Sequence, residues 1–224
     1  MLTKMWKHFK TITYHRYLVA KGCFSVGLYY QGLTHDLSKY APSEFLVGAR
    51  YYQGNRSPNN AEREEKGYSS AWLHHKGRNK HHYEYWIDYS AVEIETGFAP
   101  AQMPRRYVVE MFMDRVAASK VYNGAAYKDS DPLLYFSKGK GKGFLHPKTE
   151  ALLELMLMML ARYGEKETFA YIRDHILRKK SIPTRMRQRR VQVAVRRAFG
   201  RALKRARLQE KRRARIRRQY QMDK

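Results

Sequence analysis

The segment 104–122 predicts a helix that carries an acid on its apolar face. Residues at steps of four, three, four and three lie on one side of a helix. Five residues follow that spacing here: Tyr107, Met111, Asp114, Ala118 and Val121. We therefore expect Asp114 to face the interior of the fold. A carboxylate is costly there unless a cation, a metal ion or several hydrogen-bond donors meet it.

Helical spacing recurs along the chain and predicts an all-α fold. No alternating strand pattern and no internal repeat is found in the sequence. Glycine, proline and asparagine mark the boundaries between the predicted helices. We expect further helices over roughly 5–30, from near Leu33 through residue 39, from Asn60 to about Lys76, over 148–163 and over 165–179.

Other ligand-type residues fall on inward positions of two more predicted helices. His15 lies on the apolar face of the first helix, and His35 and Asp36 stand side by side in an apolar stretch. Imidazole nitrogen and carboxylate oxygen together suit Mn, Fe, Co, Ni or Zn, with Mg possible at oxygen-rich sites. The sequence therefore predicts a site for a divalent metal ion formed by His15, His35, Asp36 and Asp114.

Each of these residues also has a structural interpretation. A single histidine on an apolar face is more often a hydrogen-bonded core residue than a ligand. Asp36 could cap a helix by accepting from backbone N–H groups, and Asp114 could pair with Arg115 or Lys120. These explanations lose force when all four residues are considered together, and we favour the metal site.

The order His…His-Asp…Asp resembles the HD-domain superfamily of metal-dependent phosphohydrolases, and 35-HDLSK-39 resembles the HDxxK form of its HD-GYP branch. The resemblance implies an HD-domain-like helical bundle over residues 1–180. It implies that His15, His35, Asp36 and Asp114 hold one ion. It also implies catalytic roles for Asp36 and Lys39, with the lysine placed to meet a substrate phosphate.

In the HD-GYP branch additional histidines hold a second metal ion, and 74-HHKGRNKHH-82 stands where those histidines would be. The resemblance implies that His75 and His82 bind this ion or contact phosphate. Which member of each pair points inward, His74 or His75 and His81 or His82, stays open. The combination HDLSKY…SEF…RYYQG…RSPN…HHKGRNKHHYEYW is similar to a family of uncharacterised bacterial and phage proteins over roughly residues 8–175.

The C-terminal segment 181–224 forms a separate basic region. It contains 17 Lys and Arg against two acidic residues, so it supplies +15 of the formal net charge of +25. Apolar residues recur every four positions from Val191 to Leu203, which predicts a basic amphipathic helix or a disordered tail. Such a charge favours RNA or DNA backbones. The predicted contacts are Arg189, Arg190, Arg196, Arg197, Arg201, Lys204 and Arg205.

Together these patterns predict a metal-dependent phosphohydrolase acting on a nucleotide or another phosphate ester, with one or two metal ions. The alternative is a non-catalytic RNA- or DNA-binding accessory protein that acts through the basic tail. Cys23 is the single cysteine, so no intramolecular disulfide forms. No apolar run approaches the ~20 residues of a membrane span, and no signal peptide is recognised. We therefore expect a cytoplasmic protein.

Overall fold

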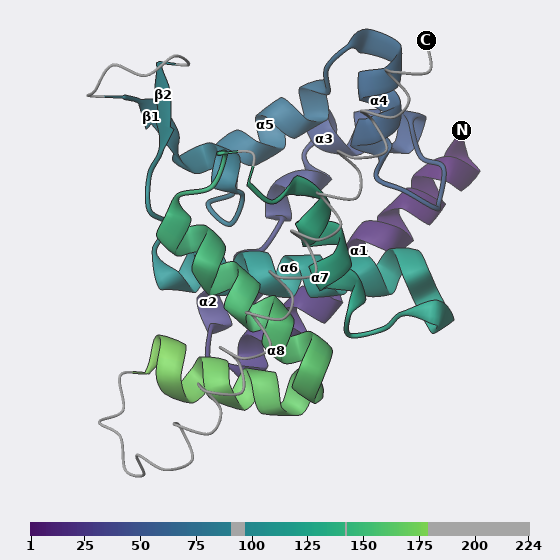
Figure 1. The fold of residues 1–224 in the computed structure, drawn as a ribbon. Helices are drawn as coiled ribbons and strands as arrows, with labels where there is room; N and C mark the ends of the chain where they lie inside the picture. Colours follow the sequence, from purple (N-terminus) through teal and green to yellow (C-terminus); the bar gives the residue numbers. More distant parts are fainter. Residues whose placement is uncertain (91–96, 142, 179–224) are drawn as a thin grey trace, which may run out of the picture. The chain divides into compact units, whose positions relative to one another are not determined.

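The described part of the chain is built almost entirely of helices. The computed structural model describes residues 1–90, 97–141 and 143–178 (Figure 1). The predicted all-α class is confirmed. The α-helices are α1 (Leu2–Ser25), α2 (Tyr29–Thr34), α3 (Pro42–Arg50), α4 (Pro58–Lys66), α5 (Ser70–Arg78), α6 (Arg105–Asn123), α7 (Asp131–Gly139) and α8 (Pro147–Tyr171).

Short elements connect these helices. A small antiparallel sheet, which the sequence did not predict, pairs β1 (Ile87–Tyr89) with β2 (Phe98–Pro100). The rings of Tyr89 and Phe98 stack across it with centroids 5.1 Å apart, as aromatic cross-strand pairs commonly do. Turns of 3-10 helix cover Leu37–Tyr40, Tyr83–Trp86 and Gly124–Ala126, and a π-helical turn covers Ile172–Leu177.

The hydrophobic core lies where α1, α6 and α8 pack together. Helix α6 packs against both α1 and α8. Val19 of α1, Phe112 of α6 and Leu153, Leu157 and Leu160 of α8 are fully buried in one cluster. The α8 residues recur at steps of four and three, so they form a single apolar stripe. This packing makes α1 and α6 rigid supports for polar side chains.

Glycines with positive φ decide two of the helix boundaries. Gly67 has φ 79° and ends α4, so the single predicted helix from Asn60 to Lys76 is in fact two helices. Gly164 has φ 75° and breaks α8, where two helices were predicted. Positive φ suits glycine because it has no Cβ to clash with the neighbouring backbone. The first predicted helix also ends early, at Ser25.

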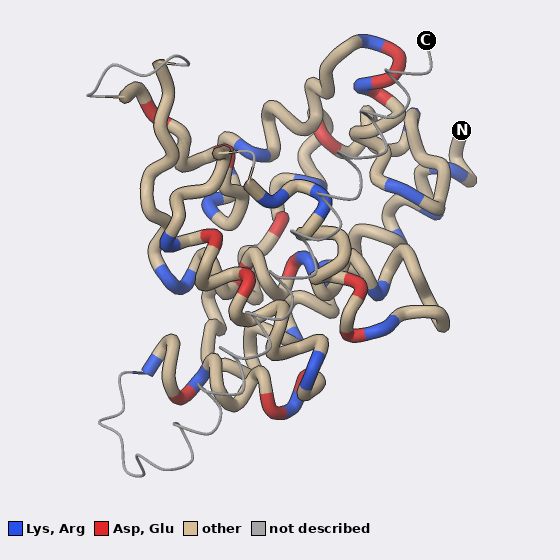
Figure 2. The backbone as a smooth tube through the Cα atoms, viewed as in Figure 1, with Lys and Arg blue, Asp and Glu red and all other residues tan. Residues whose placement is uncertain are grey.

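Charged residues of both signs are spread along the described helices (Figure 2). None of the helices in the described part is long and apolar enough to cross a membrane. The predicted basic helix or tail, 181–224, lies outside the described residues. So do its predicted nucleic-acid contacts, Arg189, Arg190, Arg196, Arg197, Arg201, Lys204 and Arg205.

Candidate metal centre

The His35-Asp36 pair lies just beyond a helix, and the prediction of a helix running through the pair is wrong. α2 ends at Thr34, His35 has non-helical backbone (φ −50°, ψ 126°), and Asp36 adopts the left-handed region with φ 53°. Aspartate tolerates that region better than most residues. Arg16 holds the segment by donating its Nε–H to the His35 carbonyl oxygen at 2.7 Å. Both consecutive side chains are buried as a result.

The four residues predicted from helical spacing and adjacency come together, with both imidazole Nε2 atoms facing one oxygen of each aspartate. His15 of α1 places Nε2 3.0 Å from Asp114 Oδ1 and 3.7 Å from Asp36 Oδ2. His35 places Nε2 3.4 Å from Asp36 Oδ2 and 3.6 Å from Asp114 Oδ1. We call these four residues the His15 group. Their ligand atoms lie close enough together to hold one metal ion.

A second group of ligand atoms gathers on the other oxygen of Asp36. His75 Nε2 lies 3.2 Å and His81 Nε2 3.3 Å from Asp36 Oδ1, and His82 completes the set. We call Asp36, His75, His81 and His82 the His75 group. His75 is near the end of α5, whereas His81 and His82 follow the helix in a turn. Asp36 therefore belongs to both groups through different oxygens.

The structure resolves the choice that the sequence left open within the two histidine pairs. His75 faces Asp36, and so do both members of the second pair, although only His82 was predicted there. His74 points elsewhere: its Nδ1 lies 2.6 Å from Glu44 Oε1, and its side chain is 24% exposed. Since α5 ends at Arg78, the seven-residue spacing between the pairs is not a helical repeat. The sequence left His81 undecided because a turn has no periodicity that marks a face.

Two buried glutamates that sequence reasoning missed orient the imidazoles from behind. Glu110 Oε1 lies 3.0 Å from His35 Nδ1 and 3.2 Å from His81 Nδ1, so it contacts one histidine of each group. Glu44 Oε2 lies 2.7 Å from His75 Nδ1. A carboxylate behind a metal-binding histidine fixes its tautomer and orientation. Glu110 precedes Asp114 by one helical turn on α6, a spacing that could have identified it.

The atoms that face the centre of the cluster match those that a metal ion would need. The Nε2 atoms of His15, His35, His75, His81 and His82, and Asp36 Oδ1, are buried and make no hydrogen bond with any described residue. Asp36 Oδ2 is paired with the Lys39 ammonium at 2.6 Å. Where a glutamate accepts from Nδ1–H, a neutral ring has its lone pair on Nε2. A lone pair that faces a buried carboxylate oxygen is unfavourable unless a cation or proton lies between them. The donor set therefore fits metal ions.

The electrostatics leave Asp36 ionised and divide the histidines into two kinds. Burial acts to lower the pKa of His35 and of His75, but attraction to Asp36 outweighs it and raises both pKa values, so a metal ion would bind these two rings by displacing their protons. Burial acts to raise the pKa of Asp36, but attraction to His35 and Lys39 outweighs it and holds the pKa well below its ordinary value. Burial and then the neighbouring His81 and His75 hold the pKa of His82 well below its ordinary value. An ionised carboxylate and a neutral imidazole are the forms that coordinate a metal.

Lys39 lies at the edge of the cluster. Its ammonium is 2.6 Å from Asp36 Oδ2, and its side chain is 30% exposed. Burial acts to lower the pKa of Lys39, but Asp36 and Asp114 outweigh it, so the pKa lies above its ordinary value and the amine is protonated at neutral pH. Its catalytic role stays a prediction.

The fold and the site define an all-α protein with a buried His, Asp and Glu cluster that could hold metal ions. The chain belongs to the family of unknown function DUF5662, whose family model matches residues 4–159. That span includes both ligand groups and both glutamates. The predicted similarity to a family of unknown function is confirmed, whereas membership of the HD-domain superfamily stays a prediction. No curated protein and no solved structure was found to match the chain.

Proposed function

We propose that this protein is a metal-dependent phosphohydrolase of the HD-domain type, acting on a nucleotide or another phosphate ester. One observation carries the proposal. Buried imidazole Nε2 atoms of His15, His35, His75 and His81 face carboxylate oxygens at 3.0–3.7 Å without a hydrogen bond among the described residues. Such an arrangement is expected for ligands prepared to bind cations.

In this proposal the two groups hold two divalent ions that share Asp36. The His15 group offers two imidazoles and two carboxylates, and the His75 group offers three imidazoles and one carboxylate. Mixed nitrogen and oxygen ligands suit Mn, Fe, Co, Ni or Zn, with Mg less suited to the nitrogen-rich His75 group. Glu110 and Glu44 keep the imidazoles in the tautomer that presents Nε2 to the ions.

The proposed chemistry is hydrolysis of a phosphate ester beside Asp36. Bound divalent ions would activate a water molecule, by lowering its pKa from ~15.7 towards ~7, and would offset negative charge on the phosphoryl oxygens. Lys39 contributes a positive point charge at the same place. Asp36 joins the two ligand groups, because each of its carboxylate oxygens faces a different group.

Hydrolysis of p-nitrophenyl phosphate by metal-loaded protein tests the proposal without a known natural substrate. We expect turnover with at least one of Mn, Fe, Co, Ni, Zn or Mg, and its loss in Asp36→Ala and Asp114→Ala. The matched control is Asp88→Ala, which removes an exposed aspartate from β1. Metal-independent turnover, or equal turnover in all four proteins, would contradict the proposal.

The charge of the tail favours a second proposed activity beside hydrolysis. We propose that residues 1–180 form the catalytic domain and that 181–224 bind RNA or DNA, because 17 basic side chains in that segment release counterions from a nucleic-acid backbone. Deleting 184–224 separates the activities. Hydrolysis should persist while salt-dependent nucleic-acid binding is lost. Loss of both with retained folding would favour the non-catalytic accessory protein.

A further inference from the structure

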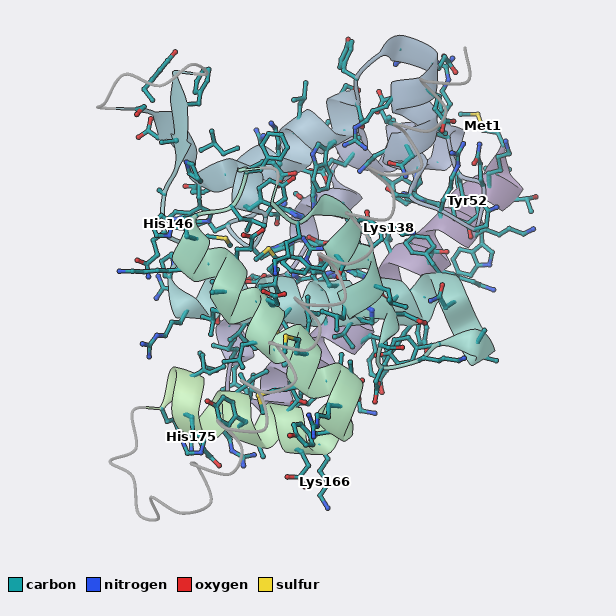
Figure 3. The ribbon with its side chains drawn as sticks, in the orientation of Figure 1. Met1, Tyr52, Lys138, His146, Lys166 and His175 are labelled. Atoms are coloured by element: carbon teal, nitrogen blue, oxygen red, sulfur yellow. The ribbon has the colours of Figure 1, made fainter. Side chains whose placement is uncertain are left out.

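A cleft opens beside the metal centre, and its inner end includes part of the cluster. Thr11, Lys39, Tyr52, Ser57, His75 and Tyr122 are among the residues that line it. We call it the Tyr52 cleft. It contains about 570 Å³ of empty space, part of which is open solvent. Tyr52 is labelled in Figure 3, beside α1.

The inner end of the Tyr52 cleft leads to the ligand groups. His75 lines the cleft, and its Nε2 lies 3.2 Å from Asp36 Oδ1. Lys39 lines it as well, with its ammonium 2.6 Å from Asp36 Oδ2. A phosphate that enters the cleft would therefore meet both a cation and the edge of the metal centre. This end of the cleft is suited to the reacting phosphate.

The rest of the cleft wall mixes apolar residues with hydroxyl and amide groups. The Thr11 hydroxyl and the Tyr52 hydroxyl form a hydrogen bond of 2.9 Å, and Ser57 and Asn59 lie nearby in the lining. Burial raises the pKa of Tyr122, which keeps its phenol neutral. Hydroxyl and amide groups both donate and accept hydrogen bonds, so this wall complements a ligand that carries hydroxyl groups.

His8 adds an unpaired polar atom to the same wall. Its side chain is buried, with 6% exposure, and its Nδ1 has no hydrogen-bond partner in the described part of the chain. Burial, and then repulsion from Lys39, lowers the pKa of His8 to about 4, so the ring is neutral at neutral pH. A buried polar atom without a partner commonly marks a place where a ligand or water binds.

The charges of the cleft suit one phosphate rather than a nucleic-acid strand. Lys39 and Arg56 are the cations among the described residues that line it. Arg56 is already bound to both carboxylate oxygens of Glu64, at 2.6 Å each. Polyanion grooves instead present many free cations along the backbone. Lys39 lies at the metal end, where its ammonium is paired with Asp36 Oδ2 at 2.6 Å while its side chain stays 30% exposed. The carboxylate of Glu44 also lines the cleft.

We propose that the Tyr52 cleft is the substrate site and that it binds a small phosphate monoester whose organic part carries hydroxyl groups, of the sugar or nucleoside class. The inference rests on the proposed phosphohydrolase function. The phosphate lies at Lys39 and His75, and the hydroxyl-bearing part lies against Thr11 and Tyr52. In the reaction the oxygen of water forms a bond to phosphorus, the ester P–O bond breaks, and the departing alkoxide takes a proton from that water. The products are an alcohol and inorganic phosphate.

Competition against p-nitrophenyl phosphate tests the cleft separately from the metal chemistry. Ribose 5-phosphate should inhibit turnover at least about tenfold more strongly than inorganic phosphate, because it adds several hydrogen bonds at the Tyr52 wall. Tyr52→Phe and Thr11→Val should each weaken that inhibition by about 5- to 10-fold. Inhibition by inorganic phosphate and the metal content should stay unchanged. Tyr89→Phe, at an exposed tyrosine of β1, is the control.

The outcomes distinguish the cleft proposal from the function on which it rests. Metal-dependent turnover with equal inhibition by ribose 5-phosphate and inorganic phosphate would overturn the cleft proposal alone. A 5′-phosphorylated oligonucleotide as the stronger inhibitor would overturn it in favour of a polymer. If no turnover occurs, the proposed function fails. Titration calorimetry on metal-loaded protein then still tests whether the cleft binds ribose 5-phosphate. Binding of ribose 5-phosphate weakened by Tyr52→Phe supports it, and no binding overturns it.

Discussion

The His15 group and the His75 group share one aspartate but are held by different kinds of structure. His15 and Asp114 lie on α1 and α6, two long helices that pack in the hydrophobic core. His75 lies near the end of a short helix, and His81 and His82 lie in the turn after it. Long, buried helices fix side chains through core packing, whereas a turn needs local hydrogen bonds to do the same.

The buried glutamates reflect this difference. Glu110 supports His35 in the first group and His81 in the second, whereas Glu44 contacts only His75 among the proposed ligands. The turn that carries His81 is thus tied to α6 through a carboxylate that also serves the His15 group. We infer that a change at Asp36 or Glu110 alters metal binding by both groups. A change at Glu44 alters metal binding by the His75 group alone.

The largest effect is expected from Asp36→Ala, which removes the residue common to both groups. Both ions should be lost, and the affinity for each should fall by more than about 100-fold. Losing only a residue that orients a ligand already reduces metal affinity by up to about 100-fold, and Asp36 is itself a proposed ligand. Elemental analysis of metal-loaded protein checks this, with Asp88→Ala as control. Retention of one ion would show that the groups do not depend on a shared carboxylate.

Glu110→Gln should weaken both groups by about 10- to 100-fold in metal affinity. The substitution replaces an anionic carboxylate, which accepts from two imidazole N–H groups, by a neutral amide. His35 and His81 therefore lose the charged partner that sets their tautomer. Competition with a chelator measures the affinities, and the visible spectrum of Co²⁺-loaded protein reports ligand geometry. If only one of the two ions is affected, the coupling through Glu110 is wrong.

Glu44→Gln should affect the His75 group alone. We expect about a 10-fold loss of affinity for one ion, while the second ion is retained as in the unaltered protein. The same chelator competition measures the two affinities. They are then compared with those of Glu110→Gln, in which both ions should be weakened. Equal weakening of both ions in the two variants would remove the distinction between the groups.

Lys39→Met should have the smallest effect on metal content and a separate effect on rate. Neither group requires the ammonium as a ligand, so both ions should stay bound. Turnover of p-nitrophenyl phosphate should fall by about 10- to 100-fold in kcat/KM, consistent with losing one charge that stabilises the transition state. Loss of metal from this variant would instead indicate a structural role for Lys39 in positioning Asp36.

Residues on long helices were the most predictable part of the molecule. The all-α class, the α6 helix and the break at Gly164 followed from helical spacing and from glycine. His15 and Asp114 could be located on inward faces for the same reason. Their roles as metal ligands stay predictions, since geometry alone does not identify the ion.

The parts that sequence reasoning missed depend on irregular backbone or on distant contacts. The left-handed conformation of Asp36 breaks the predicted helix through His35, and no local pattern marks it. His81 faces the cluster through a turn, and Gly67 divides one predicted helix into two. Glu44 meets His75 from 31 residues away, so only the packing of α3 against α5 reveals the pair.

Anomalous X-ray scattering from crystals of the full-length protein loaded with Mn or Zn tests the central claim most directly. We predict two peaks, one on each side of the Asp36 carboxylate. One peak should lie within bonding distance of the His15 group and the other within bonding distance of the His75 group. The absence of any peak beside Asp36 in fully loaded crystals would contradict the account. The cluster would then be a network of protonated histidines paired with carboxylates.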